Sequence, residues 1–240
     1  MDELREKCPW DKKQTFESLR NLTIEETYEL ADAILLKDKI GIKEEIGDLF
    51  LHLVFYCKLG EESGDFSVTE VLNGICDKLI DRHPHIYGDL VIKDEKEVLE
   101  NWENLKLKGG KKSVLEGVPL NLPALIKAYR LQEKTAQVGF EWKKPEEVWE
   151  KVQEELKELE EAVSSGKKED VEMEFGDVLF SLVNYARFLK IDPEIALEKV
   201  NKKFKYRFEF IESNAGKPIS EMSLEEMEIL WQEAKNRQKT

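Results

Sequence analysis

The strongest restriction on the fold of this chain comes from an internal repeat. Residues 44–56 read EEIGDLFLHLVFY, and residues 173–185 read MEFGDVLFSLVNY. In the first copy the run from Leu49 to Tyr56 is almost wholly apolar, which predicts a buried helix. Glu45 and Asp48 stand three residues apart at the start of that run, so they share one face of the helix. Because buried charge is costly unless it is paired or bound to a metal, these carboxylates require a compensating partner.

The repeat extends over both halves of the 240 residues. Each half has an EExxE and an ExxD pattern, and an offset of 129 relates Glu25, Glu26, Glu29, Glu45 and Asp48 to Glu154, Glu155, Glu158, Glu174 and Asp177. A Lys/Arg pair and a Trp-x-x-x-Lys pattern also recur, as Lys78, Arg82, Trp102 and Lys106 and as Lys203, Arg207, Trp231 and Lys235. The offset falls to 125 for the Lys/Arg pair, which predicts a loop four residues longer in the first half, near GEESGD. Two homologous domains, 1–110 and 111–240, follow, with the boundary in KGGKKSVLEGVP.

The hydrophobic pattern predicts helices throughout and shows no convincing strand alternation. The expected helices of the second half are 145–164, 168–189, 193–213 and 223–238, with a preceding one near 121–137. Those of the first half are 14–37, 42–61, 67–82 and 94–107. Pro145 and Asp192-Pro193 suit helix starts, Gly166 a helix stop, and Ser223 with Glu226 a capping box. The expected fold class is all-α, a tandem repeat of two helical domains.

Composition excludes several classes of partner. The net charge of −14 argues against nucleic acid polymers and anionic membranes, which demand a basic surface. Cys8, Cys57 and Cys76 show no CxxC spacing, which indicates a reduced, cytoplasmic protein. The N-terminal MDELREK lacks the apolar stretch of a signal peptide, and no run approaches the roughly 18 apolar residues of a membrane span.

In each half, the spacing of the acidic patterns lets a helix finish, turn and return antiparallel. Four carboxylates then converge: Glu155, Glu158, Glu174 and Asp177 in the second half, and Glu26, Glu29, Glu45 and Asp48 in the first. Such a group repels itself unless a hard divalent cation lies within it, and all-oxygen ligation suits Mg²⁺ or Mn²⁺ rather than zinc. Gly47 and Gly176 cost helix stability at these sites, which suggests close approach of a neighbouring helix or a ligand.

The acidic residues allow other interpretations. A single EExxE is most often a solvated helix face, but repetition at identical spacing beside an apolar helix argues against that interpretation. A di-iron or di-manganese bundle needs Glu-x-x-His pairs, and none of His52, His83 or His85 has a Glu three residues before it. The HPH at 83–85 makes a poor zinc site, and we expect a structured turn there.

These patterns, with CPWDKKQTFESL near the start and RHPHIYGD further on, resemble the MazG family of nucleoside triphosphate pyrophosphohydrolases. SVLEGVP and VGFEW extend the resemblance over nearly the whole chain. It implies a Mg²⁺-binding, tandem-domain helical protein, usually a homodimer, that cleaves between the α- and β-phosphates to give a nucleoside monophosphate and pyrophosphate. It maps the metal ligands onto the second-half carboxylates above, and the phosphate and nucleotide contacts onto Lys203, Arg207, Trp231 and Lys235. Met173 departs from the acidic residue usual in the family, which the first half keeps as Glu44.

The chemistry of the residues fits that resemblance. Glu154 or Glu25, if not used as a metal ligand, could orient or deprotonate a water, and Lys203 with Arg207 could meet the departing pyrophosphate. Trp231 suits either base stacking or a core position. We expect the second half, with its basic NKKFKYR segment, to carry the larger share of activity.

Several alternatives stay open at this point. They are a non-catalytic nucleotide-binding regulatory module, a structural helical oligomer and a more selective dUTP-type hydrolase. The cellular role, removal of aberrant nucleotides or control of the nucleotide pool, is open too.

Overall fold

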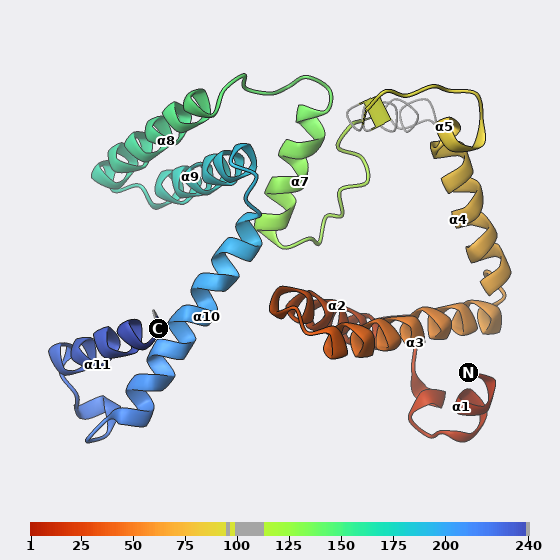
Figure 1. Ribbon diagram of the computed structural model, residues 1–240, viewed down its shortest axis with the longest axis horizontal. Helices are drawn as coiled ribbons and strands as arrows, with labels where there is room; N and C mark the ends of the chain where they lie inside the picture. The colour runs from red at the N-terminus through yellow and green to blue at the C-terminus, as the bar shows by residue number, and fades with distance from the viewer. Residues whose placement is uncertain (95–96, 99–112, 239–240) are drawn as a thin grey trace. The chain divides into compact units, whose positions relative to one another are not determined.

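The computed structural model describes residues 1–94, 97–98 and 113–238, and every regular element within these ranges is a helix (Figure 1). The all-α prediction is therefore confirmed. The chain divides into two compact units, unit 1 at Met1–Lys93 and unit 2 at Asp94–Thr240. The domain boundary expected after residue 110 falls outside the described residues and stays a prediction.

Unit 1 is built on a helical hairpin. Its elements are α1 (Asp2–Lys7), the 3₁₀ helix η1 (Asp11–Lys13), α2 (Phe16–Leu36), α3 (Lys39–Ser63), α4 (Val68–Arg82) and α5 (Pro84–Tyr87). The reversal between α2 and α3 uses Lys37 in the left-handed region, at φ 57°, followed by Asp38, whose side chain accepts a hydrogen bond from the Ile40 amide at 3.0 Å. Leu19 of α2 packs with Phe55 and Leu59 of α3 in the core of this hairpin.

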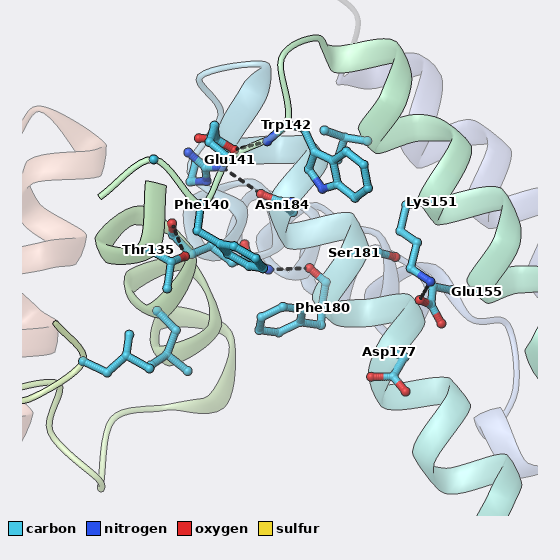
Figure 2. A pocket seen from close by; sticks show the side chains of 16 residues that line it. Thr135, Phe140, Glu141, Trp142, Lys151, Glu155, Asp177, Phe180, Ser181 and Asn184 are labelled. Atoms are coloured by element: carbon cyan, nitrogen blue, oxygen red, sulfur yellow. Dashed lines mark hydrogen bonds and ion pairs between the residues drawn. The ribbon is translucent and has the colours of Figure 1, made fainter. Parts of the chain in front are cut away.

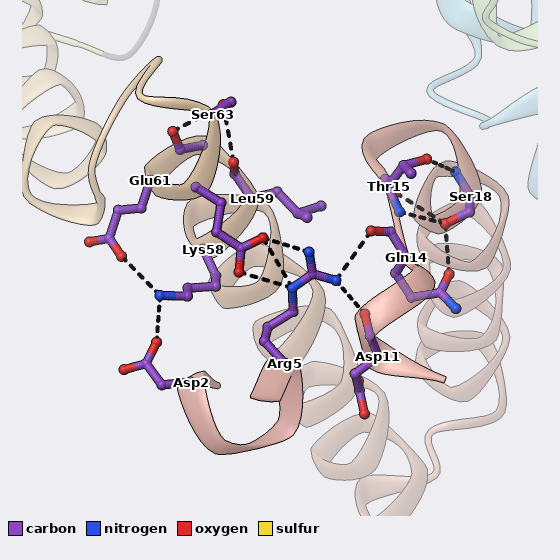
Figure 3. Close-up of polar contacts among 12 residues, drawn as sticks. Asp2, Arg5, Asp11, Gln14, Thr15, Ser18, Lys58, Leu59, Glu61 and Ser63 are labelled. Carbon is purple, nitrogen blue, oxygen red and sulfur yellow. Dashed lines mark hydrogen bonds and ion pairs between the residues drawn. The ribbon is translucent and has the colours of Figure 1, made fainter. Parts of the chain in front are cut away.

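Arg5 fastens the N-terminal segment of unit 1 to the end of α3 (Figure 3). Its Nε donates to the Glu62 carboxylate at 3.0 Å, and its Nη1 donates to the backbone carbonyls of both Asp11 and Gln14. The guanidinium also lies 5.5 Å from the centroid of the Phe55 ring. Arg5 thus covers the core of the hairpin while its charge is neutralised by Glu62.

Unit 2 repeats the hairpin and adds a helix before it. Its elements are α7 (Ala124–Ala136), α8 (Pro145–Ser165), α9 (Lys168–Phe188), α10 (Pro193–Asn214), the 3₁₀ helix η2 (Ile219–Glu221) and α11 (Leu224–Arg237). Helices α8 and α9 form the hairpin, α7 packs on α9, and α10 pairs with α11 (Figure 1). Val148 and Val152 of α8 are fully buried.

The predicted ends of the unit 2 helices are confirmed. Pro145 and Pro193 occupy first-turn positions, and α8 ends at Gly166 with φ 71°. Ser223 and Glu226 form the expected capping box at the start of α11.

The predicted longer loop in the first half is wrong. The connections after α3 and α9, residues 64–67 and 189–192, have equal length, whereas α3 has 25 residues and α9 has 21. The four extra residues therefore add about one turn of helix. Glycine is required at position 60, because a Cβ there would stand 2.5 Å from the Phe66 ring, and Gly64 at φ 73° ends the helix.

Three further predictions concern a helix over 94–107, the HPH segment and membrane-spanning helices. The helix expected over 94–107 lies almost wholly outside the described residues. The HPH segment forms the short helix α5, and the Nδ1 atom of His83 lies 2.6 Å from the Leu79 carbonyl oxygen. No helix in the described parts of the chain is both long and apolar enough to cross a membrane.

Candidate active site

In unit 2, three carboxylates from the two hairpin helices meet. Glu155 projects from α8, and Glu174 and Asp177 project from α9. One oxygen from each lies within 4.8 Å of the others. Glu155 is buried, with 7% of its surface exposed, because the apolar face of α8 packs on α9 around it. This arrangement offers an all-oxygen donor set of the kind that Mg²⁺ and Mn²⁺ prefer.

Unit 1 carries the corresponding group on its own hairpin. Glu26 and Glu29 of α2 approach Glu45 of α3, again with ligand oxygens within 4.8 Å of one another. Glu26 and Glu45 are partly buried, and Glu29 is exposed. The two units therefore each gather three of the four carboxylates that the sequence predicted as ligands.

The fourth carboxylate of each set lies beside its group rather than within it. Burial raises the pKa of Glu26, and the charge of Asp48 raises it further. Burial likewise raises the pKa of Glu158, with an added contribution from the charge of Glu155. Asp48 and Glu158 are thus close enough to interact electrostatically with the other carboxylates, although neither is among the three that converge.

The carboxylates of the unit 1 group repel one another. Burial is the largest cause of the raised pKa of Glu45, followed by the charges of Glu29 and Glu26. A divalent cation at this position would relieve the repulsion, because it favours the ionised form of every carboxylate around it.

Unit 2 has a counter-ion at its group. The Lys151 ammonium lies 2.7 Å from Glu155 and 2.8 Å from Glu154, one turn away on the same helix. The hydrogen bonds to Glu154 and Glu155 raise the pKa of Lys151, which is therefore charged at neutral pH. The equivalent residue in unit 1 is Leu22, so the lysine at this repeat position is present only in the second copy.

The two predicted catalytic carboxylates stand apart from the converging groups. Glu154 is exposed on α8 and paired with Lys151, and Glu25 is exposed on α2. Both remain available to contact water or substrate. Their catalytic role stays a prediction.

The predicted substrate-binding residues of unit 2 gather on α10 and α11. The Arg207 guanidinium lies 5.3 Å from the Trp231 ring centroid, and its Nε donates to Gln238 at 2.8 Å. Lys203 is exposed and Lys235 is partly buried. Trp231 also packs edge-on against Phe204, with ring centroids 5.3 Å apart, so the ring has both aromatic and cationic neighbours.

Two of the corresponding residues of unit 1 are described. Lys78 is exposed on α4, and Arg82 is partly buried at the end of that helix. Trp102 and Lys106 lie outside the described residues.

Gly47 and Gly176 were predicted to lie close to a neighbouring helix or a ligand. A Cβ at Gly47 or Gly176 would have no neighbouring atom within 4 Å among the described residues. The predicted close approach of another helix is therefore wrong, because both positions face open space. Approach of a ligand stays a prediction.

A pocket of about 630 Å³ adjoins the carboxylates of unit 2. Figure 2 shows Lys151, Glu155 and Asp177 at one end and Phe140, Trp142 and Thr135 toward the other. The complete lining consists of Leu115, Leu131, Gln132, Thr135, Gly139, Phe140, Glu141, Trp142, Val148, Lys151, Glu155, Asp177, Phe180, Ser181, Asn184 and Arg187. Sequence reasoning missed this pocket, because its walls come from α7, α8, α9 and two connecting segments. Lys203, Arg207, Trp231 and Lys235 are not among the residues that line it.

Comparison with known proteins bears on both units. The profile of the MazG nucleotide pyrophosphohydrolase domain matches residues 14–87 and 143–210. A Thermotoga maritima protein named nucleoside triphosphate pyrophosphohydrolase/pyrophosphatase MazG is 46% identical over 250 residues, covering 100% of this chain and 94% of that protein. An Escherichia coli K12 protein named nucleoside triphosphate pyrophosphohydrolase is 39% identical, covering 96% of this chain and 91% of that protein. The uncharacterized Bacillus subtilis protein YabN is 46% identical over 95% of this chain and 48% of its own length.

Proposed function

This chain belongs to the MazG nucleotide pyrophosphohydrolase family and is a nucleoside triphosphate pyrophosphohydrolase, and we propose that it works with Mg²⁺ held by the hairpin carboxylates. The products would be the nucleoside monophosphate and pyrophosphate. The observation that carries the proposal is the convergence of three carboxylates on the hairpin of each unit, two of them at equivalent repeat positions, with Glu155, Glu174 and Asp177 forming the second group. Mn²⁺ would suit the same donor set.

The carboxylates fit a hard divalent cation in number and kind. When bound, such a cation neutralises phosphate charge and lowers the pKa of a coordinated water. Glu155, Glu174 and Asp177 would hold it in unit 2, and Glu26, Glu29 and Glu45 in unit 1. Asp48 and Glu158, beside these groups, would complete the shells directly or through water.

The residues around the unit 2 group would position the substrate and the attacking water. Lys151 lies against Glu155, where its ammonium can donate to a phosphate oxygen that approaches the carboxylates. Glu154, one residue before Glu155 and exposed, would orient or deprotonate the water. We assign stabilisation of the leaving pyrophosphate to Lys203 and Arg207, as the sequence pattern predicts.

A direct test measures products for a panel of ribo- and deoxynucleoside triphosphates with and without Mg²⁺. We expect monophosphate and pyrophosphate, and no turnover when Mg²⁺ is chelated. Glu174→Ala should lower turnover strongly, whereas Glu172→Ala, an exposed acidic position on the same helix, should not. Diphosphate and orthophosphate as products would contradict the proposal, because they place the attack at the γ-phosphorus.

We further propose that the enzyme is a homodimer. Helix α3 leaves Phe50 64% and Leu53 56% exposed, and α9 leaves Met173 66% exposed. Small helical units commonly bury such faces against a second copy. A single species of monomer mass in multi-angle light scattering at micromolar concentration would contradict this proposal.

The cellular setting is also a proposal. Cys8, Cys57 and Cys76 are all free thiols, which supports a reducing cytoplasm as the working environment. The net charge of −14 supports free nucleotides rather than nucleic acid polymers or membranes as the partners.

A further inference from the structure

The second helix of each hairpin has a cation that contacts the chain preceding the hairpin. At the repeat offset of 129, Lys58 in α3 corresponds to Arg187 in α9. Lys58 forms an ion pair with Asp2 at 2.6 Å, and Asp2 precedes the first hairpin. Arg187 forms an ion pair with Glu141 at 2.6 Å, and Glu141 lies in the connection between α7 and α8, which precedes the second hairpin. Both units therefore fasten the preceding chain to the second helix of the hairpin.

In unit 1 this attachment is reinforced by a forked contact. The Nε and Nη2 of Arg5 both donate to the Glu62 carboxylate. The Nη1 of Arg5 donates to the backbone carbonyls of Asp11 and Gln14. Two parallel bonds from a guanidinium to one carboxylate are stronger than a single charge-assisted hydrogen bond. All three nitrogens of Arg5 thus hold the chain before the first hairpin in place.

In unit 2 the ion pair uses a single guanidinium nitrogen. The Nη2 of Arg187 donates to Oε1 of Glu141 at 2.6 Å and to Oδ1 of Asn184 at 2.9 Å (Figure 2). The Nε of Arg187 is buried and has no hydrogen-bond partner among the described residues. An unpaired buried donor raises the free energy of the fastened state. The contact between Arg187 and Glu141 is therefore easier to break than the forked contact of Arg5.

The segment that Glu141 fastens buries little surface of its own. Every residue from Val138 to Lys144 is exposed, including Phe140 at 82% and Trp142 at 45%. Hydrophobic burial therefore contributes little to holding this segment in place. Regions with few buried apolar contacts are the ones that open most readily, so the ion pair has a large share in keeping the segment closed.

A hinge lies at the start of this segment. Gly139 has φ 86°, and a Cβ there would have no neighbour within 4 Å among the described residues, so glycine serves the backbone conformation rather than packing. The amides of Gly139 and Phe140 donate to the carbonyls of Ala136 and Thr135, in the last turn of α7, at 3.0 and 3.1 Å. Rotation about Gly139 would break both bonds and move the residues that follow.

We propose that Glu141 and Arg187 are positioning residues for the reaction of unit 2, and that their ion pair is a latch that holds residues 139–144 against α9. Gly139, Phe140, Glu141 and Trp142 form part of the wall of the pocket beside the carboxylates. Closing this wall shields the site from water, and opening it admits substrate and releases products. The inference rests on the proposed function, because the latch would control hydrolysis at the unit 2 carboxylates.

Amide hydrogen exchange in the nucleotide-free protein tests the latch without the reaction. The amides of Gly139 and Phe140 report opening, since both lose a hydrogen bond when the segment moves. Glu141→Gln removes the charge and keeps the shape, so it should speed their exchange about fivefold to tenfold, the difference between a charge-assisted and a neutral hydrogen bond. The control Glu161→Gln removes a carboxylate from an exposed ion pair with Lys157 of α8 and should leave their exchange unchanged.

Lysine substitutions separate the single-nitrogen contact from the forked one. Arg187→Lys introduces the cation that unit 1 has at this repeat position. One ammonium can replace one guanidinium nitrogen, so exchange should stay within about twofold of the wild type, whereas Arg187→Gln should match Glu141→Gln. Arg5→Lys should instead speed exchange of the Gln14 amide, which donates to the Asp11 carbonyl at 3.1 Å, because an ammonium cannot form the fork.

Turnover distinguishes a positioning role from a purely structural contact. Glu141→Gln and Arg187→Gln should each lower kcat/KM for pyrophosphate release with Mg²⁺ by the same factor as they speed exchange, and Arg187→Lys should retain most of the activity. The charge swap Glu141→Arg/Arg187→Glu should recover part of the loss. Asn184 can support the swapped pair, because its Nδ2 can donate to the carboxylate that Arg187→Glu introduces. Glu161→Gln should leave kcat/KM unchanged.

The outcomes distinguish the latch from the reaction itself. Unchanged exchange in Glu141→Gln would show that the ion pair does not hold the segment, and faster exchange with unchanged kcat/KM would exclude a positioning role. Equal losses for Arg187→Lys and Arg187→Gln would contradict the single-nitrogen contact. Absence of Mg²⁺-dependent pyrophosphate release from the wild-type protein would refute the proposed function instead, and the exchange rates would still decide whether the latch exists.

Discussion

Each hairpin brings three carboxylates together, two of them at equivalent repeat positions, yet the surroundings of the two groups differ. Beside the carboxylates, unit 2 has Lys151 where unit 1 has Leu22. Along the next helix, unit 2 has Asn184 at a pocket where unit 1 has the buried Phe55. One copy thus combines a carboxylate group with a counter-ion and a cavity, and the other combines a similar group with a filled core. The comparison indicates that the convergence of carboxylates and the presence of a cavity beside them are separable.

The largest difference in stability should appear at the core position. Phe55→Ala should cost unit 1 about 3–5 kcal/mol of unfolding free energy, because it empties a fully packed site. Asn184→Ala should cost unit 2 only about 1 kcal/mol, since the side chain borders a cavity that already exists and its loss removes one hydrogen bond, from Arg187. Chemical denaturation of each variant measures both values, with Tyr87→Ala, which removes an exposed ring, as the control for loss of an aromatic ring. Equal losses for Phe55 and Asn184 would remove the contrast between core and pocket.

Substitution of the counter-ion Lys151 should have a smaller effect, on Mg²⁺ affinity. Lys151→Met should raise the Mg²⁺ affinity of nucleotide-free unit 2 about tenfold, because a positive charge beside the cation is removed. Leu22→Lys is the matched change and should lower the affinity of unit 1. Calorimetric titration, with the other unit disabled by Glu45→Ala or Glu174→Ala, measures each site alone. A fall in affinity on Lys151→Met would mean that the lysine supports the carboxylate group rather than competing with the metal.

The smallest predicted effect is a pH dependence of metal stabilisation. Because the pKa values of Glu26 and Glu45 are raised on folding, metal-free unit 1 loses stability as pH rises from their ordinary value of 4.5 through the raised values. Mg²⁺ binds the ionised carboxylates and should offset this loss. The increase in melting temperature caused by Mg²⁺ should therefore be larger at pH 8 than at pH 5, by a few degrees. A Glu26→Gln/Glu45→Gln double variant should flatten the difference, and an equal increase at both pH values in the wild type would contradict the prediction.

Local signals in the sequence were enough to predict the helices. Pro145, Gly166 and the Ser223–Glu226 pair act within one helical turn, so their effects can be read without knowing the fold. The carboxylate groups were predictable as well, because two antiparallel helices joined by a short turn bring fixed spacings face to face. Which three of the four converge depends on side-chain packing across the hairpin. Spacing alone does not determine that.

The length of helix α3 and the pocket could not be predicted from local sequence patterns. GEESGD has the composition of a turn, but its first four residues continue α3, and the Phe66 ring packs against Gly60. The pocket depends on α7 lying against α9, a contact between residues such as Gln132 and Phe180 that are 48 apart in the chain. Neither feature has a local pattern. The VGFEW segment, which belongs to the family resemblance, is the sequence signal that includes Phe140.

The central claim is that unit 2 carries most of the turnover, and a paired substitution tests it most directly. Glu174→Ala and Glu45→Ala remove equivalent carboxylates, one from each group, and each variant would be checked for folding by circular dichroism. Pyrophosphate release from several nucleoside triphosphates would then be measured with saturating Mg²⁺. The account predicts that Glu174→Ala loses most of the activity and that Glu45→Ala keeps the larger share. Abolished turnover in Glu45→Ala, with Glu174→Ala near the wild-type rate, would contradict it.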